Sequence, residues 1–182
     1  MLFLMSTSKG VNMHVSIRLL TYHVNQDDPK KCTAKKLKRL RLADITHDIR
    51  DIPRNGIILN PLAKTVFAPE DRVYAEKDGI VAIDCSWNNV DDMFSKLRRF
   101  RIHRALPFLI PVNPVNYGKP FQLTTLEAFI ASLYIIGEEE HAKKISTLYK
   151  WSQHFITLNE KYLRAYRNTS TRAEILEIMQ RI

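Results

Sequence analysis

The strongest constraint on the fold is a run of four apolar residues, 80–83 (IVAI), which lies between Gly79 and Asp84. An apolar run without polar alternation is typical of a strand that is buried on both faces, as in a parallel sheet. Residues 15–22 and 57–60 predict two further strands, and helices are predicted to begin near Thr33 and at Pro69. Strands that alternate with helices predict an α/β fold with a parallel-type sheet.

The second half of the chain predicts helices only. Thr124 and Glu127 have the spacing of a capping box in front of a helix over 128–136, and Gly137 is expected to end that helix. Further helices are expected over 138–150 and 151–166, with a last one capped by Thr171. We therefore expect a flexible leader over 1–14, an α/β domain with a basic surface over 15–105, and an all-α domain over 106–182.

Basic side chains are concentrated in two blocks that contain no acidic residue. The chain has 182 residues, with 28 Lys and Arg against 19 Asp and Glu, and a formal net charge of +9. Such clusters neutralise phosphates, although one block alone could equally be a solvated helix face. Neither block carries a broad apolar face or interleaved aromatic residues, so a folded RNA fits better than a membrane or a stretched single strand, and DNA stays open. The predicted RNA-binding residues are Lys30, Lys31, Lys35, Lys36, Lys38 and Arg39 in the first block, and Arg98, Arg99 and Arg101 in the second, which extends to Arg104.

Several kinds of site are excluded by the sequence. The five glycines are scattered, so neither a P-loop nor a dinucleotide-binding fingerprint is present. Cys32 and Cys85 are too few for a disulfide framework or a four-sulfur zinc site, and the histidines have no metal-ligand spacing, so no metal is expected. No apolar run is long enough to span a bilayer, and two cysteines fit a reducing compartment, so a cytoplasmic protein is expected.

The segments that follow the predicted strands predict a pocket. In open α/β sheets, ligands bind outside the carboxyl ends of the strands. Asp84 offers a carboxylate at such an end, and Trp87 offers a flat apolar surface three residues later. Each alone is more often a cap or a core residue, but together they predict a ligand site at this edge.

Five short motifs occur in an order that resembles one enzyme family. They are residues 28–33 (DPKKCT), 59–61 (LNP), 84–87 (DCSW), 106–109 (LPFL) and 113–118 (NPVNYG). The family is that of the aminocarboxypropyltransferases that modify a pseudouridine in small-subunit ribosomal RNA during ribosome biogenesis, and the chain resembles its archaeal-type members. The resemblance implies a SPOUT-like fold in which the C-terminal part threads a loop as a deep trefoil knot.

The resemblance also implies a reaction and its site. The implied donor is S-adenosyl-L-methionine, whose 3-amino-3-carboxypropyl group is transferred to N3 of a pseudouridine or N1-methylpseudouridine, and no metal is implied. The implied donor-binding residues are Thr33, Leu59, Pro61, Val81, Trp87, Leu106, Phe121, Leu123 and Thr125. Main-chain groups near Val81, Leu106 and Phe121 are implied to hold the nucleoside. Thr33 and Thr125 are implied to face the amino acid arm, and both lie at predicted helix starts, where an anion is favoured.

Asp84 is the candidate catalytic residue. Its carboxylate could accept the proton of the uracil N3, or it could be a structural hydrogen-bond partner that shapes the pocket, and the sequence leaves both roles open. The partner is expected to be small-subunit rRNA or a pre-ribosomal particle, approached by a monomer. Two other functions are compatible with the sequence: a SPOUT-type RNA methyltransferase on the same fold, and a non-catalytic rRNA-binding assembly factor.

Overall fold

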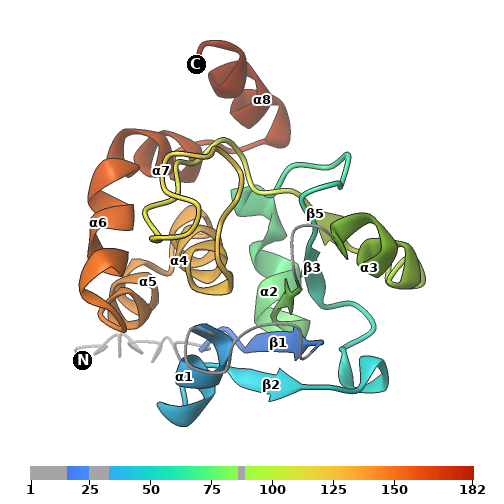
Figure 1. Ribbon diagram of the computed structural model, residues 1–182. Helices are drawn as coiled ribbons and strands as arrows, with labels where there is room; N and C mark the ends of the chain where they lie inside the picture. Colours follow the sequence, from blue (N-terminus) through green and yellow to red (C-terminus); the bar gives the residue numbers. More distant parts are fainter. Residues whose placement is uncertain (1–15, 25–32, 86–88) are drawn as a thin grey trace, which may run out of the picture.

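Five parallel strands form the sheet around which the molecule is built (Figure 1). The computed structural model describes residues 16–24, 33–85 and 89–182. The strands are β1 (Leu19–His23), β2 (Asp44–Thr46), β3 (Ile57–Leu59), β4 (Ile80–Asp84) and β5 (His103–Arg104), in the order β2-β1-β4-β3-β5. The apolar run 80–83 lies in β4, which pairs with β1 on one side and β3 on the other. The predicted α/β fold with a parallel sheet is confirmed.

Helices cover the sheet and make up most of the C-terminal part. They are α1 (Thr33–Arg39), α2 (Arg72–Asp78), α3 (Val90–Lys96), α4 (Thr125–Ile135), α5 (Glu139–Ser146), α6 (Lys150–Leu158), α7 (Glu160–Arg167) and α8 (Arg172–Gln180), with the short 3-10 helices η1 (Ile49–Asp51) and η2 (Pro69–Asp71). The helix predicted at Pro69 begins as η2 and continues as α2. Gly79 ends α2 with a φ of 81°, in the left-handed region that favours glycine.

Alternate side chains of the strands enter two separate hydrophobic clusters. Leu19 and Ile80 belong to the larger cluster, which also contains residues of α1, α4 and the C-terminal helices. Leu20 and Val81 point to the other face, where they pack with α3. Figure 1 accordingly shows α3 and α4 on opposite sides of the sheet. Because both faces are covered, the strands are buried as the apolar run predicts.

α4 is the central helix of the larger cluster. The Thr124 hydroxyl accepts the backbone N–H of Glu127 at 3.3 Å, and the Glu127 carboxylate accepts the backbone N–H of Thr124 at 2.8 Å, so the predicted capping box is confirmed. α4 packs against β4 as well as against α5, α6 and α7. The larger cluster therefore contains residues from both sides of position 105.

Two helix predictions are wrong in their boundaries. The helix expected over 138–150 ends at Ser146, and Tyr149 is extended (φ −135°, ψ 152°) as the N-cap of α6. The single helix expected over 151–166 is divided at Asn159, which caps α6 at its end and α7 at its start. The strands β2 (DIT) and β5 (HR) were not predicted, because they are short and largely polar, whereas the equally short β3 (IIL) is marked by its apolar run.

Candidate donor site at the carboxyl edge of the sheet

A cavity of about 490 Å³ opens at the carboxyl ends of β3 and β4. Its wall comes from the last residues of these strands and those that follow them, from the first residue of α1, from two residues of α3, and from residues between Leu106 and the first turn of α4. Parallel strands bring these distant segments together because their carboxyl ends meet at one edge. The volume lies within the range of small-molecule and cofactor sites.

Most of the predicted site residues meet in this cavity. The predicted residues that line it are Thr33, Leu59, Pro61, Asp84, Leu106, Phe121, Leu123 and Thr125. Asn60, Phe94 and Asn113 also line it and were not predicted, although Asn60 and Asn113 lie within two of the five motifs. Trp87 lies outside the described residues.

Val81 does not line the cavity with its side chain. Its side chain is 0% exposed and belongs to the smaller cluster, on the α3 face of the sheet. The neighbouring Ala82 lines the cavity instead, because successive side chains of a strand point to opposite faces. A contact from Val81 to a ligand is therefore restricted to its main chain, which is the group that the resemblance implies.

The carboxylate of Asp84 lies among polar groups at the floor of the cavity. Oδ1 accepts the hydroxyl of Thr125 at 3.4 Å, and Oδ2 lies 3.5 Å from Nε2 of His23. The His23 side chain is 1% exposed and the Asp84 side chain 13%. His23 was not singled out from the sequence, but β1 and β4 pair with His23 opposite Asp84. A signal was available in the sequence, since His23 directly follows the strand predicted over 15–22, as Asp84 directly follows the apolar run 80–83.

The mouth of the cavity carries exposed apolar side chains. Val115 and Phe121 line the cavity, yet they are 74% and 48% exposed. Phe121 has a φ of 68°, an uncommon conformation for a residue with a side chain, and its ring packs edge-on against Phe108 at 5.7 Å between centroids. The cavity is therefore open to solvent on the side of the segment 113–121.

The first basic block divides into surface and structural side chains. Lys38 and Arg39 are exposed on α1, and with Lys35 and His47 they border a shallow concavity. Lys36 differs, because its Nζ donates to the carbonyl oxygen of Leu148 at 2.6 Å and lies 3.7 Å from the centre of the Tyr149 ring. The Lys36 ammonium therefore joins α1 to the turn before α6, a structural contact that the sequence did not predict, while its contact with RNA stays a prediction. Lys30 and Lys31 lie outside the described residues.

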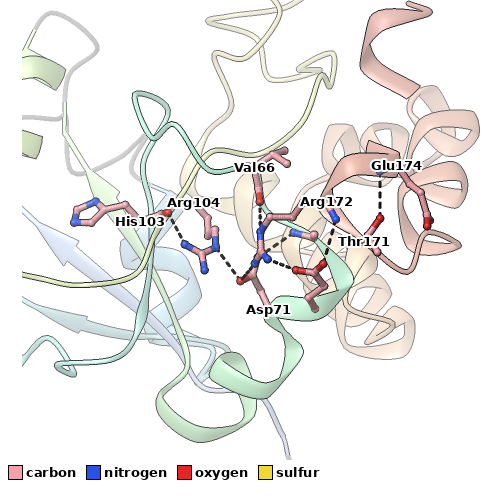
Figure 2. Close-up of polar contacts among 9 residues, drawn as sticks. Val66, Asp71, His103, Arg104, Thr171, Arg172 and Glu174 are labelled. Atoms are coloured by element: carbon pink, nitrogen blue, oxygen red, sulfur yellow. Dashed lines mark hydrogen bonds and ion pairs between the residues drawn. The ribbon is translucent and has the colours of Figure 1, made fainter. Parts of the chain in front are cut away.

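The second basic block follows the end of α3. Arg98, Arg99 and Arg101 are exposed, and Arg99 Nη2 donates to the carbonyl oxygen of Ile49 at 3.2 Å. Arg104, the last residue of the block in sequence, has a structural partner, since its Nε donates to Oδ1 of Asp71 at 2.8 Å (Figure 2). Asp71 is 0% exposed, and a buried carboxylate needs a cationic partner. The surface part of the second block therefore ends before Arg104.

Neither a metal cluster nor a membrane-spanning helix occurs in the part of the chain that the structure describes. No three His, Cys, Asp or Glu side chains gather there as they would around a metal ion. None of the helices in these residues is both long and apolar enough to cross a bilayer.

When the chain is compared with known proteins, two family models match it. One, described as "Ribosome biogenesis protein, C-terminal", matches residues 57–182. The other, described as "Possible Fer4-like domain in RNase L inhibitor, RLI", matches residues 17–47. That second range contains one cysteine, Cys32, so it lacks the set of cysteine ligands that an iron–sulfur cluster needs.

Individual relatives carry more specific names than the two family models. The 16S rRNA aminocarboxypropyltransferase of Methanocaldococcus jannaschii is 44% identical over 163 residues, which cover 90% of this chain and 94% of the relative. That of Vulcanisaeta distributa is 46% identical over 150 residues, covering 82% and 81%. A solved structure described as the SAM-dependent rRNA:acp-transferase Tsr3 from Vulcanisaeta distributa matches with a TM-score of 0.81 at 40% identity, over 90% of this chain and 96% of that one. The five motifs, the fold and these relatives agree, and the chain belongs to the 16S rRNA aminocarboxypropyltransferase family.

Proposed function

We propose that this chain transfers the 3-amino-3-carboxypropyl group of S-adenosyl-L-methionine to N3 of a pseudouridine or N1-methylpseudouridine in small-subunit rRNA. The observation that carries the proposal is the cavity at the carboxyl edge of the sheet, where Asp84, Thr125 and apolar residues from distant segments converge. Relatives that carry this activity in their names are similar over almost the whole chain.

The chemistry of the cavity wall fits this donor. Leu59, Pro61, Leu106 and Leu123 offer an apolar surface for the adenine. Thr125 is the first residue of α4, an 11-residue helix whose positive end favours the carboxylate of the amino acid arm. The Asp84 carboxylate beside it favours the positively charged sulfonium and ammonium groups. Thr33 and Trp87 complete the proposed donor site.

The proposed step is a displacement at one carbon. The bound donor supplies an electrophilic γ-carbon next to its sulfonium sulfur. The N3–carbon bond forms as the sulfur–carbon bond breaks, methylthioadenosine leaves, and Asp84 accepts the N3 proton. Positioning selects the reacting carbon, since only the carbon in line with N3 at near-attack distance reacts. A purely structural role for Asp84, through its bond to Thr125, is the alternative.

A double-label assay tests the function. S-adenosyl-L-methionine labelled in its carboxyl carbon, and separately in its methyl carbon, is supplied with small-subunit rRNA. We expect label in the RNA from the carboxyl carbon only. Label from the methyl carbon alone would show an RNA methyltransferase. RNA binding without donor binding would show a non-catalytic assembly factor.

The proposed RNA partner is reached through the two basic surfaces. Lys35, Lys38 and Arg39 lie on α1, and Arg98, Arg99 and Arg101 follow α3, all of them available to phosphates. Lys30 and Lys31, which lie outside the described residues, are proposed as phosphate contacts from the sequence alone. We place this activity in the cytoplasm, with rRNA or a pre-ribosomal particle as the substrate of a monomer.

The proposal also includes two features of the fold. One is a domain boundary at position 105, and the other is a deep trefoil knot. The segment after β5 contacts α4 and α7 before the chain enters α4, which supports a threaded path. Cyclising the folded chain and then denaturing it tests the knot. A knotted ring stays more compact in denaturant than a ring cyclised from the unfolded chain, and equal radii would contradict a knot.

A further inference from the structure

The irregular segment 108–113 belongs to no strand, and it connects two stretches that line the cavity. Leu106 and Pro107 line it just before the segment, Asn113 lines it at the end of the segment, and Val115 and Asn116 follow. The segment lies between β5 and α4, drawn in yellow beside α4 and α7 in Figure 1. Leu109, Val112 and Asn113 are 0%, 8% and 1% exposed, so the backbone of the segment is largely removed from water. Buried backbone N–H and C=O groups need hydrogen-bond partners, which a neighbouring strand would normally provide.

Three buried side chains provide these partners at alternate residues. The Tyr166 hydroxyl, from α7, donates to the carbonyl oxygen of Phe108 at 3.1 Å. The Asn159 side chain makes two bonds with Ile110: its Nδ2 donates to the carbonyl oxygen at 2.8 Å, and its Oδ1 accepts the N–H at 2.8 Å. Burial raises the pKa of Tyr166, which keeps its hydroxyl protonated and able to donate. Asn159 thus bonds the segment as a strand partner would.

Glu127 holds the segment at its other end. Its Oε1 accepts the N–H groups of Val112 and Asn113 at 2.7 and 3.0 Å, and its Oε2 accepts Nδ2 of Asn113 at 2.8 Å. The same Oε2 accepts the N–H and the hydroxyl of Thr124 at 2.8 and 2.9 Å. One buried carboxylate therefore fixes both ends of the loop 113–124, and this loop contributes Asn113, Phe121 and Thr124 to the cavity wall.

We propose that Glu127, Asn159 and Tyr166 are positioning residues for the donor: they set the shape of the cavity wall through segment 108–113 without touching the donor. All three side chains are 0% exposed, and none of the three lines the cavity. The proposal rests on the donor site described above. A carboxylate is required at Glu127, because both of its oxygens accept, whereas the amide of a glutamine would present a donor to one set of N–H groups.

The test compares three variants with matched controls. The variants are Glu127→Gln, Asn159→Asp and Tyr166→Phe. The controls are Glu138→Gln, which changes a buried carboxylate that pairs with Arg72 beyond the other end of α4, and Tyr134→Phe, which changes a buried tyrosine of α4. Amide hydrogen exchange in the free protein measures how well the backbone of segment 108–113 is protected. Calorimetry measures the affinity for S-adenosyl-L-methionine, and urea unfolding measures the global free energy of unfolding.

We expect exchange at Ile110, Val112 and Asn113 to rise about tenfold in Tyr166→Phe and more in Glu127→Gln, relative to β4 amides. Donor affinity should fall about three- to tenfold in the same variants, the order expected for one lost hydrogen bond. The controls should change neither quantity beyond their effect on global stability. Tyr166→Phe is the mildest change, so it decides the question if Glu127→Gln does not fold.

Two outcomes overturn the positioning role. One is unchanged donor affinity in a variant whose segment exchanges faster, and the other is unchanged exchange in every variant. The unaltered protein separates this failure from a failure of the proposed function. If it binds no donor, the proposed function itself fails, whereas normal binding that the variants do not weaken counts only against the positioning residues.

Discussion

The pairing of β1 with β4 places two ionisable side chains together at the cavity floor. His23 lies opposite Asp84 in the parallel register, and its ring is buried while the carboxylate reaches the cavity. With Thr125 on one oxygen and His23 near the other, the carboxylate of Asp84 is held in a fixed orientation. Both possible roles of Asp84, as a proton acceptor and as a structural hydrogen-bond partner, require this fixed orientation. Only a measurement of the transfer rate therefore distinguishes them.

Replacing Asp84 by asparagine keeps the shape of this group and removes its capacity to accept a proton. If Asp84 is the general base, transfer should slow by on the order of 100- to 10,000-fold while donor affinity changes little. Single-turnover kinetics and calorimetry measure the two quantities. Asp91→Asn, at an exposed position in the first turn of α3, is the matched control. A normal rate in Asp84→Asn would reduce Asp84 to a structural residue.

The ionisation of Asp48 tests the structure at a position away from the cavity, where Asp48 is hydrogen-bonded to Arg50. Hydrogen bonds from the side chain and then the backbone N–H of Arg50 lower the pKa of Asp48 to about 2, from 3.8. Because the folded value is the lower one, this interaction stabilises the fold above pH 3.8 and is lost as the pH falls through about 2. Titration followed by NMR should show the shift, and Arg50→Ala should return the value toward 3.8, whereas Arg54→Ala should not. A pKa of Asp48 near 3.8 in the unaltered protein would contradict the hydrogen bonds between Asp48 and Arg50.

Among the elements, η2, β5 and α8 are joined by one buried carboxylate. Oδ1 of Asp71 accepts from Arg104 and from Arg172, which lies at the start of α8, and its Oδ2 accepts the backbone N–H of Ala68 at 3.0 Å (Figure 2). Arg172 also donates to the carbonyl oxygen of Val66 at 3.1 Å. The C-terminal helix is therefore attached to the edge of the sheet by charge as well as by packing.

Removing Arg104 should destabilise the protein strongly. Breaking a buried ion pair leaves an uncompensated charge, and we expect Arg104→Leu to cost about 3 kcal/mol because Arg172 still contacts Asp71. Arg18→Ala is the control, since Arg18 and Asp44 form an exposed pair at 3.2 Å and such pairs contribute less than about 1 kcal/mol. Urea unfolding measures both. An equal loss in the two variants would show that burial adds nothing to the Asp71 pair.

Elements with local signals were predictable, and elements that depend on distant partners were not. The capping box of Thr124 and Glu127 and the glycine stop at Gly79 are short-range features, so the sequence alone predicts them. The break at Asn159 was missed because Asn159 bonds to Ile110, which is 49 residues away. The contact of Lys36 with Leu148 was missed for the same reason, since Leu148 lies 112 residues further along the chain.

On the scale of the whole molecule, the two basic surfaces lie on opposite faces of the sheet. α1 contributes Leu37 to the larger cluster, and α3 contributes Phe94 to the smaller one. Each helix begins beside the cavity, and each has seven residues, so its far end is about 10 Å away. The basic residues that follow α3 therefore lie at a distance from the reacting group, where they can contribute affinity without taking part in the chemistry.

Charge removal should distinguish phosphate contacts from structural lysines. Arg98→Gln together with Arg101→Gln should weaken rRNA binding and reduce the slope of log affinity against log salt by about one for each lost phosphate contact. Lys36→Gln removes the same charge from a position tied to Leu148, so it should leave the slope unchanged. Filter binding over a range of salt concentrations measures the slope. A slope unaffected by the arginine changes would remove this surface from the RNA interface.

The placement of the cationic patches on the two faces of the sheet limits the size of the substrate. A free nucleoside or a short oligonucleotide could occupy the cavity but would touch at most one patch. Only a nucleic acid that curves around the rim of the sheet can engage both while its target base enters between them. In the proposed reaction, the architecture therefore favours a large, folded ribosomal RNA over a short fragment before any base is recognised.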